Sequence, residues 1–200
     1  MTTAAAAVRR LTLAAVACAA VLACGARPLC AQSTQAADIN REYTIKAAYL
    51  YQFGHYVEWP AETFADGQAP LVIGVLRNDA LGNLVLDDIL KEIARTKSIG
   101  GRPIVVAHFP SMAQYTTCHI LYVPATAGPD EQAAAIRQVG QSPVLLVGEQ
   151  PGFAALGGTV NFIVENNKIR FEINTATAAR QRLKISSKLL SLAKLVEGPS

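Results

Sequence analysis

The chain has 200 residues, of which 51% are hydrophobic and 16% charged, with four cysteines and a formal net charge of +3. A chain of this length can bury a sizeable core, and its 14 Gly and 10 Pro are ordinary numbers, so a collagen, a disordered chain and a small disulfide-framework protein are excluded. Whether the protein is basic or disulfide-bonded depends on where its charges and cysteines lie.

The N-terminal region has the pattern of a secretory signal peptide. Two arginines precede an uncharged apolar run that ends at Cys24, and the small residue Ala31 follows. At about 14 residues the run is shorter than the ~20 apolar residues of a membrane-spanning helix. We therefore predict a signal peptide of residues 1–31, cleaved after Ala31, and export to the periplasm. The alternatives are a lipoprotein acylated at Cys24 and an uncleaved N-terminal anchor.

Cleavage after Ala31 changes both the net charge and the number of cysteines. Three arginines leave with the signal peptide, so residues 32–200 carry 15 basic and 15 acidic residues, and no excess positive charge favours nucleic-acid binding. Three of the four cysteines leave as well, and Cys118 then has no partner within the mature chain. A lipoprotein beginning at Cys24 would keep Cys30, and a Cys30–Cys118 bridge would be open to it.

The segment 38–196 contains neither a repeat nor a linker and predicts one domain. Apolar residues at helical spacing indicate a helix over Asp38–Glu58, which ends before Trp59-Pro60. Apolar runs typical of buried strands alternate with helical patterns after it, which predicts a layered α/β domain with a mostly parallel sheet. The expected strands are Leu71–Leu76, Ile104–Phe109, His119–Val123 and Val144–Val147, and the expected helices are Ala80–Arg95 and Asp130–Val139.

An antiparallel hairpin is predicted near the C-terminus. Asn166-Asn167 tolerates the positive φ that a two-residue hairpin turn requires, between Thr159–Glu165 and Lys168–Ile173. Folding there pairs large apolar residues on one face, which fixes the register. The expected pairs are Glu165–Lys168, Val164–Ile169, Ile163–Arg170, Phe162–Phe171, Asn161–Glu172 and Val160–Ile173.

Two further helices are expected after the hairpin. Asn174 or Thr175 caps the first, which runs through Arg180. The second starts at Ser186 or Ser187, and its apolar residues, spaced three and four apart, continue to Val196. The basic residues at this end are those of a solvated helix face, with membrane binding as the alternative.

The mature chain offers little chemistry. Cys118 and His119 are neighbours and point to opposite faces of a strand, so they cannot form a nucleophile–base pair. A metal site that adds His108 to these two lacks ligand spacing, and Cys118 is expected in the core. Ser187 beside Lys188 suggests helix capping more than a catalytic dyad. We therefore predict a protein without catalytic residues, metal ligands or cofactors.

Aromatic residues are concentrated in the first helix and just after it. A core role is the first expectation for them, and a docking surface or a small-molecule pocket are the alternatives. They are Tyr43, Tyr49, Tyr51, Phe53, Tyr56 and Trp59.

Seven motifs resemble those of the YfiR-like periplasmic proteins, in the same order, over nearly all of residues 42–196. The resemblance implies an exported, non-enzymatic α/β regulator. The best-known members bind the periplasmic part of an inner-membrane diguanylate cyclase and hold it inactive, which lowers cyclic-di-GMP and disfavours biofilm formation. Members can form homodimers and use disulfides, but Cys118 here lacks a mature partner. The motifs are Ala47–Phe53, Val57–Pro60, Gly101–Ile104, Cys118–Val123, Gly157–Gly158, Ile169–Asn174 and Leu183–Leu190.

This resemblance, together with the aromatic residues, leads to a candidate partner surface. Trp, Tyr and Arg are the usual anchors of interfaces, so we expect Tyr56, Trp59 and Arg170 to contact the extracytoplasmic domain of an inner-membrane signalling protein, a diguanylate cyclase. The second hypothesis is a periplasmic small-molecule sensor with a pocket near the aromatic helix. The third is a hydrolase that uses Ser187 with Lys188.

Overall fold

A computed structural model describes residues 30–76 and 81–198. Residues 1–29 of the predicted signal peptide, Cys24 among them, lie outside these residues, as does the side chain of Cys30. The chain divides into two compact units, Met1–Asp38 and Ile39–Ser200. Helix α2 (Cys30–Tyr56) contains residues of both units, whereas the strands and the other described helices belong to the second. None of the helices within the described residues combines the length and apolar character needed to cross a bilayer.

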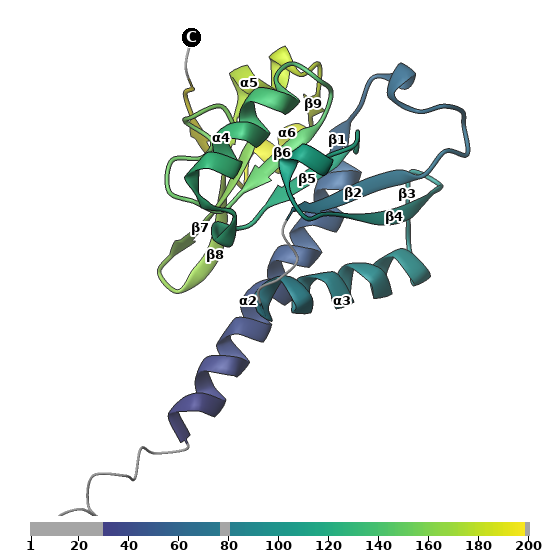
Figure 1. The fold of residues 1–200 in the computed structure, drawn as a ribbon. Coiled ribbons are helices and arrows are strands. Elements are labelled where there is room, and N and C mark those ends of the chain that lie inside the picture. Colours follow the sequence, from purple (N-terminus) through teal and green to yellow (C-terminus); the bar gives the residue numbers. More distant parts are fainter. Residues whose placement is uncertain (1–29, 77–80, 199–200) are drawn as a thin grey trace, which may run out of the picture. The chain divides into compact units, whose positions relative to one another are not determined.

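The second unit is built on an eight-stranded sheet with the order β10-β8-β7-β6-β5-β2-β4-β3. The run β4-β2-β5-β6-β7 is parallel throughout, whereas β8 pairs with β7 antiparallel. The mixed α/β fold with a mostly parallel sheet and a C-terminal antiparallel hairpin is therefore confirmed (Figure 1). The strands are β2 (Leu71–Leu76), β3 (Ser98–Ile99), β4 (Arg102–Phe109), β5 (Ile120–Val123), β6 (Leu145–Gly148), β7 (Val160–Glu165), β8 (Lys168–Asn174) and β10 (Lys194–Val196).

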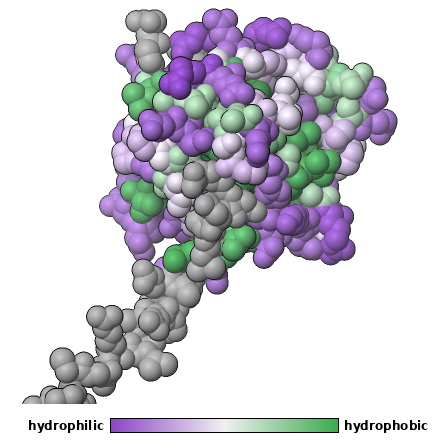
Figure 2. Space-filling model, in the orientation of Figure 1, coloured by the Kyte–Doolittle hydropathy of each residue, from purple (hydrophilic) through white to green (hydrophobic). Residues whose placement is uncertain are grey.

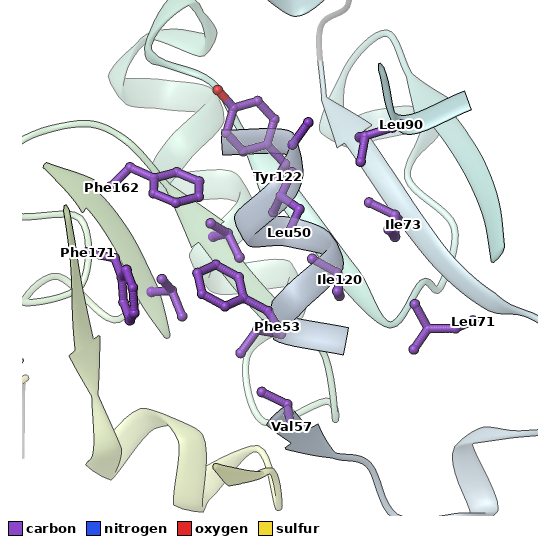
Figure 3. Close-up of a cluster of buried hydrophobic side chains, with 14 of the residues drawn as sticks. Leu50, Phe53, Val57, Leu71, Ile73, Leu90, Ile120, Tyr122, Phe162 and Phe171 are labelled. Atoms are coloured by element: carbon purple, nitrogen blue, oxygen red, sulfur yellow. The ribbon is translucent and has the colours of Figure 1, made fainter. Parts of the chain in front are cut away.

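Helices cover both faces of this sheet. Helices α2 and α3 (Leu81–Thr96) supply Phe53 and Leu90 to the core on one face, while α4 (Gly128–Val139) supplies Val139 to the core on the other. On the first face, Phe53 packs against Phe162 and Phe171 (Figure 3), with ring centroids 5.9 and 5.3 Å away. The aromatic residues of the predicted first helix are thus core residues or pack partly buried against the core, as their pattern indicates.

The end of α2 differs from the prediction. The helix stops at Tyr56, and Val57–Glu58 forms the short strand β1, which pairs antiparallel with β9 (Lys184–Ile185). Proline disfavours the helical conformation for Trp59, the residue before it, and pairing with β9 gives Val57 and Glu58 the extended conformation of a strand. The predicted helix boundary at Glu58 is therefore wrong by two residues.

The hairpin has the predicted register at every pair from Glu165–Lys168 to Val160–Ile173. Asn166 and Asn167 have φ values of 50° and 59°, as the tight turn requires. Apolar residues that remain exposed lie singly on several elements, and Figure 2 shows small green patches separated by polar surface on the face it displays.

The last predicted helix is wrong over its second half. Helix α5 (Thr175–Arg180) is capped by Asn174, which accepts a 2.9 Å hydrogen bond from the backbone N–H of Thr177. Helix α6 begins as predicted, at Ser187, but ends at Leu190, and β10 then pairs parallel with β8. The short apolar segment fits either a helix or a strand, and main-chain pairing with an available sheet edge favours the strand.

Candidate functional site

A hollow with a volume of about 430 Å³ lies where the carboxyl ends of β5, β6 and β7 meet helix α2. Open α/β sheets bind ligands outside the carboxyl ends of their strands, and this hollow, the carboxyl-edge hollow, occupies such a place. Its lining residues come from α2, from the loops after β5 and β6, and from the hairpin: Glu42, Tyr43, Lys46, Ala125, Glu149, Pro151, Phe162, Ile163, Val164 and Ile169.

Buried charges occupy one wall of the hollow. The side chains of Lys46 and Glu149 are only 5% and 4% exposed, and they form an ion pair. Lys46 Nζ also lies 2.6 Å from Glu42 Oε1, and the Glu42 side chain is 37% exposed. Two carboxylates thus share one ammonium group, which leaves this wall with a net negative charge.

These charges shift the protonation of their neighbours. Burial acts to lower the pKa of Lys46, but the carboxylates of Glu149 and Glu42 outweigh it and raise the pKa. Burial, reinforced by the Glu149 charge, raises the pKa of Tyr43 and that of the fully buried Tyr122. At neutral pH Lys46 is therefore an ammonium group and both phenols are protonated.

Backbone geometry places Glu149 at the hollow. Glu149 directly follows β6, and its Oε1 accepts a 2.6 Å hydrogen bond from the N–H of Ala125, the first residue of η3 (Ala125–Ala127) after β5. A second hydrogen bond joins the same loops, because Gln150 Nε2 donates to the Ala125 carbonyl at 2.7 Å. The loops after two adjacent parallel strands are thereby joined, which fixes the buried carboxylate toward Lys46.

A second hollow, of about 340 Å³, contains Trp59 and lies beside the β1–β9 pair. The indole Nε1 donates to the His119 carbonyl at 3.1 Å, which holds the half-buried ring in place. Arg182 and Glu62 form a 2.6 Å ion pair at its edge, and both side chains are well exposed. This feature, the Trp59 groove, is lined by Glu58, Trp59, Pro60, Ala61, Glu62, Arg182 and Lys184.

Of the three residues predicted to form a partner surface, Tyr56 and Trp59 flank β1 and both pack partly buried against the same core. Tyr56 immediately precedes β1, packs partly buried against the core, and has Lys188 Nζ 5.2 Å from its ring centroid. Arg170 lies elsewhere: it is exposed on β8, next to Phe171, whose side chain packs toward α2. Because side chains alternate along a strand, Arg170 points to the opposite face of the sheet.

The residues considered for metal binding have separate partners. Cys118 is buried in the core on the α4 side of the sheet, where burial raises the pKa of its thiol to about 12. His119 Nδ1 accepts a 3.0 Å hydrogen bond from Val72 N–H, whereas His108 Nε2 lies 2.5 Å from Asp87 Oδ1. In the part of the chain that the structure describes, no group of three His, Cys, Asp or Glu side chains is placed to bind a metal.

The serines considered for a dyad belong to the start of α6. Ser186 caps this helix, and its hydroxyl accepts a 3.2 Å hydrogen bond from Leu189 N–H. Ser187 and Lys188 are both exposed. The residues therefore have the arrangement of a helix start and not that of an enclosed nucleophile with its base.

The sequence analysis did not find the Lys46–Glu149 pair. The two residues are 103 positions apart, and neither belongs to a recognisable catalytic or ligand motif. Two weak signals exist: a lysine within an apolar helix face and a glutamate directly after a buried strand. Only the packing of α2 against the sheet brings these two positions together.

Comparison with known proteins gives one family and several structures. A family model described as YfiR/HmsC-like matches residues 43–194. No curated protein matches the sequence.

Among solved structures, a conserved domain protein of Vibrio cholerae has 15% identity and a TM-score of 0.48 over 62% of this chain and 54% of that one. An ABC domain in complex with L-Trp from Streptococcus pneumonia has 12% identity and a TM-score of 0.47 over 62% of this chain and 55% of that one. The chain therefore spans a little over half the length of these structures.

Proposed function

The chain belongs to the YfiR/HmsC-like family, and from this membership we propose that it binds the extracytoplasmic domain of an inner-membrane diguanylate cyclase and holds the cyclase inactive. Membership supports the broader role of a periplasmic regulator of cyclic-di-GMP signalling. In this role the protein acts by association and not by catalysis, and its release raises cyclic-di-GMP and favours biofilm formation. The family match over residues 43–194 is the observation that carries the proposal.

We place the partner contact at the Trp59 groove. Its exposed Arg182–Glu62 pair provides two charges for polar recognition, and the fixed Trp59 ring provides a rigid apolar contact. Aromatic and arginine side chains at the edge of a hollow are frequent anchors of interfaces. Tyr56, which precedes β1 and packs partly buried against the core, belongs to the same proposed contact. Contact with Arg170 would require the partner to reach the other face of the sheet, so Arg170 is a separate part of the proposal.

Binding of a purified extracytoplasmic cyclase domain to groove variants tests this placement. Arg182→Ala removes an exposed charge whose ion pair contributes at most about 1 kcal/mol to stability, so the variant folds. We expect it to weaken partner binding by about 30-fold, the effect of a hot-spot residue worth ~2 kcal/mol. Trp59→Phe, which loses the indole hydrogen bond, weakens binding as well.

Arg137→Ala is the matched control, since Arg137 is an exposed arginine on α4 and α4 covers the opposite face of the sheet. The control retains full affinity and repression. Unchanged partner binding by both Arg182→Ala and Trp59→Phe would contradict the groove assignment. If the wild-type protein neither binds the cyclase domain nor alters cyclic-di-GMP in cells, the regulatory proposal itself is wrong. Arg170→Ala shows separately whether the contact extends to the other face.

A second candidate function, sensing of a small molecule, is favoured by the carboxyl-edge hollow. The hollow adjoins the aromatic helix α2 and has a volume suited to a small ligand. A ligand that binds only the folded protein must raise its thermal stability, so a thermal-shift screen of periplasmic metabolites tests this candidate.

A further inference from the structure

The wall of the carboxyl-edge hollow has one more carboxylate than ammonium groups. Lys46 is engaged with both Glu149 and Glu42, and Glu149 also accepts the Ala125 N–H. Among the described residues Glu42 has Lys46 as its one ion-pair partner, and its side chain stays 37% exposed. The unbalanced negative charge is therefore concentrated at the carboxylate of Glu42, which borders the hollow.

The remaining walls are apolar and aromatic. Phe162 belongs to the buried core, while Val164 is 64% exposed at the hairpin and Ile169 is its cross-strand partner. Pro151 and the ring of Tyr43 complete this lining. Such a surface removes a hydrocarbon body from water, whereas the Tyr43 ring already has Lys46 Nζ 4.5 Å from its centroid.

From this arrangement we propose that the carboxyl-edge hollow binds a small organic ammonium ion with an apolar or aromatic body. The ammonium group balances Glu42, and the body packs on Val164, Ile169 and Pro151. This inference rests on the second candidate function and names its ligand class.

The charges argue against the other ligand classes. An anion would have to displace a carboxylate from Lys46, an exchange that leaves a buried charge without its partner and is therefore costly. A neutral apolar molecule would remove water from Glu42 without balancing its charge, which is also unfavourable. Only a cation compensates the charge that ligand binding desolvates.

Three probes with nearly the same body and different charges test the proposal. The purified protein is titrated with 2-phenylethylamine, 2-phenylethanol and phenylacetate, and binding is followed by calorimetry and thermal shift. We expect the amine to bind and to raise Tm, the alcohol to bind at least about tenfold more weakly, and the carboxylate to give no shift; tenfold corresponds to ~1.4 kcal/mol.

Variants locate the binding site. Glu42→Gln should weaken amine binding about tenfold or more, the size of a lost charge-assisted contact, and the adjacent Lys46 keeps Glu149 as its partner. Val164→Trp should weaken amine binding, because the larger side chain at this exposed lining position occupies part of the hollow without changing its charge. Glu165→Gln is the matched control, because Glu165 is an exposed carboxylate of the same hairpin outside the hollow lining, and it should leave the affinity unchanged.

The outcomes distinguish the class of ligand, the place where it binds and small-molecule sensing as such. If the alcohol or the carboxylate binds and the amine does not, the ammonium assignment is wrong while small-molecule sensing stands. If none of the probes binds, the inference is overturned, and the metabolite screen then decides whether sensing survives. Amine binding that Glu42→Gln and Glu165→Gln leave equally intact places the ligand elsewhere and overturns the site. Cyclase binding measured on the same preparations reports independently on the Trp59 groove.

Discussion

Lys46 is a buried lysine whose positive charge is compensated by nearby carboxylates. Its side chain is 5% exposed and contacts two carboxylates, one of them, Glu149, buried as well. A buried ion pair adds little net stability over an apolar pair, but removal of one partner leaves an uncompensated charge. Substitution of either Lys46 or Glu149 alone should therefore destabilise the folded protein.

Lys46→Met should lower the free energy of unfolding by about 3–5 kcal/mol, because Glu149 then lies buried without its counter-ion. The double variant Lys46→Met, Glu149→Gln should be more stable than Lys46→Met alone. Urea denaturation measures both. Lys168→Met, an exposed lysine of the hairpin, is the control and should change stability by less than about 0.5 kcal/mol. A Lys46→Met cost no larger than that of the control would contradict this account.

The pH dependence of the same variant follows from the sign of the pKa shift. The folded-state pKa of Lys46 lies above its ordinary value of 10.5, so the electrostatic contribution is fully present below pH 10.5 and is lost as pH rises through the folded-state pKa. We expect the stability difference between wild type and Lys46→Met to narrow as pH rises through the raised folded-state pKa of Lys46, in the alkaline range. Urea titrations at a series of pH values check this.

At the scale of elements, the hairpin and the C-terminal segment show what sequence can and cannot establish. The register of β7 and β8 could be predicted because the turn residues and the apolar alternation are local and mutually consistent. The end of the chain could not: Leu189, Leu190, Leu192 and Val196 fit helical spacing, yet Lys194–Val196 pairs with β8, more than twenty residues earlier. The Lys46–Glu149 pair likewise joins positions far apart in the sequence, because it forms only when α2 packs against the sheet at the end of β6.

The turn itself gives an element-scale prediction. Asn167 has a φ of 59°, which costs a β-branched residue roughly 1–2 kcal/mol more than it costs asparagine or glycine. Asn167→Val should therefore lower the free energy of unfolding by about that amount, while Asn167→Gly should leave it unchanged or raise it slightly. Lys168→Val, at the next position, where β8 begins, is the control in denaturant titrations. Equal stability of the two valine variants would contradict the turn assignment.

At the scale of the whole molecule, the sheet separates two apolar cores, and Cys118 reports on the one beneath α4. The residue is 2% exposed, and burial raises the pKa of its thiol to about 12. Since the thiolate is the reactive species, a native thiol at pH 8 reacts only through opening of the fold. The rate at which the Cys118 thiol reacts therefore reports how often this core opens, and its response to distant substitutions shows whether the domain opens as one unit.

Thiol titration of the full chain and of Cys118→Ala isolates this residue from the other three cysteines. In native buffer at pH 8 the two proteins should show the same number of fast-reacting thiols, and in denaturing guanidinium they should differ by one. The rate of the slow Cys118 reaction should rise in variants that destabilise the distant hairpin, such as Asn167→Val, because exposure of Cys118 requires the sheet to open as a unit. If the Cys118 reaction rate does not change when the hairpin is destabilised, the core under α4 opens independently. The two cores would then be separate cooperative units.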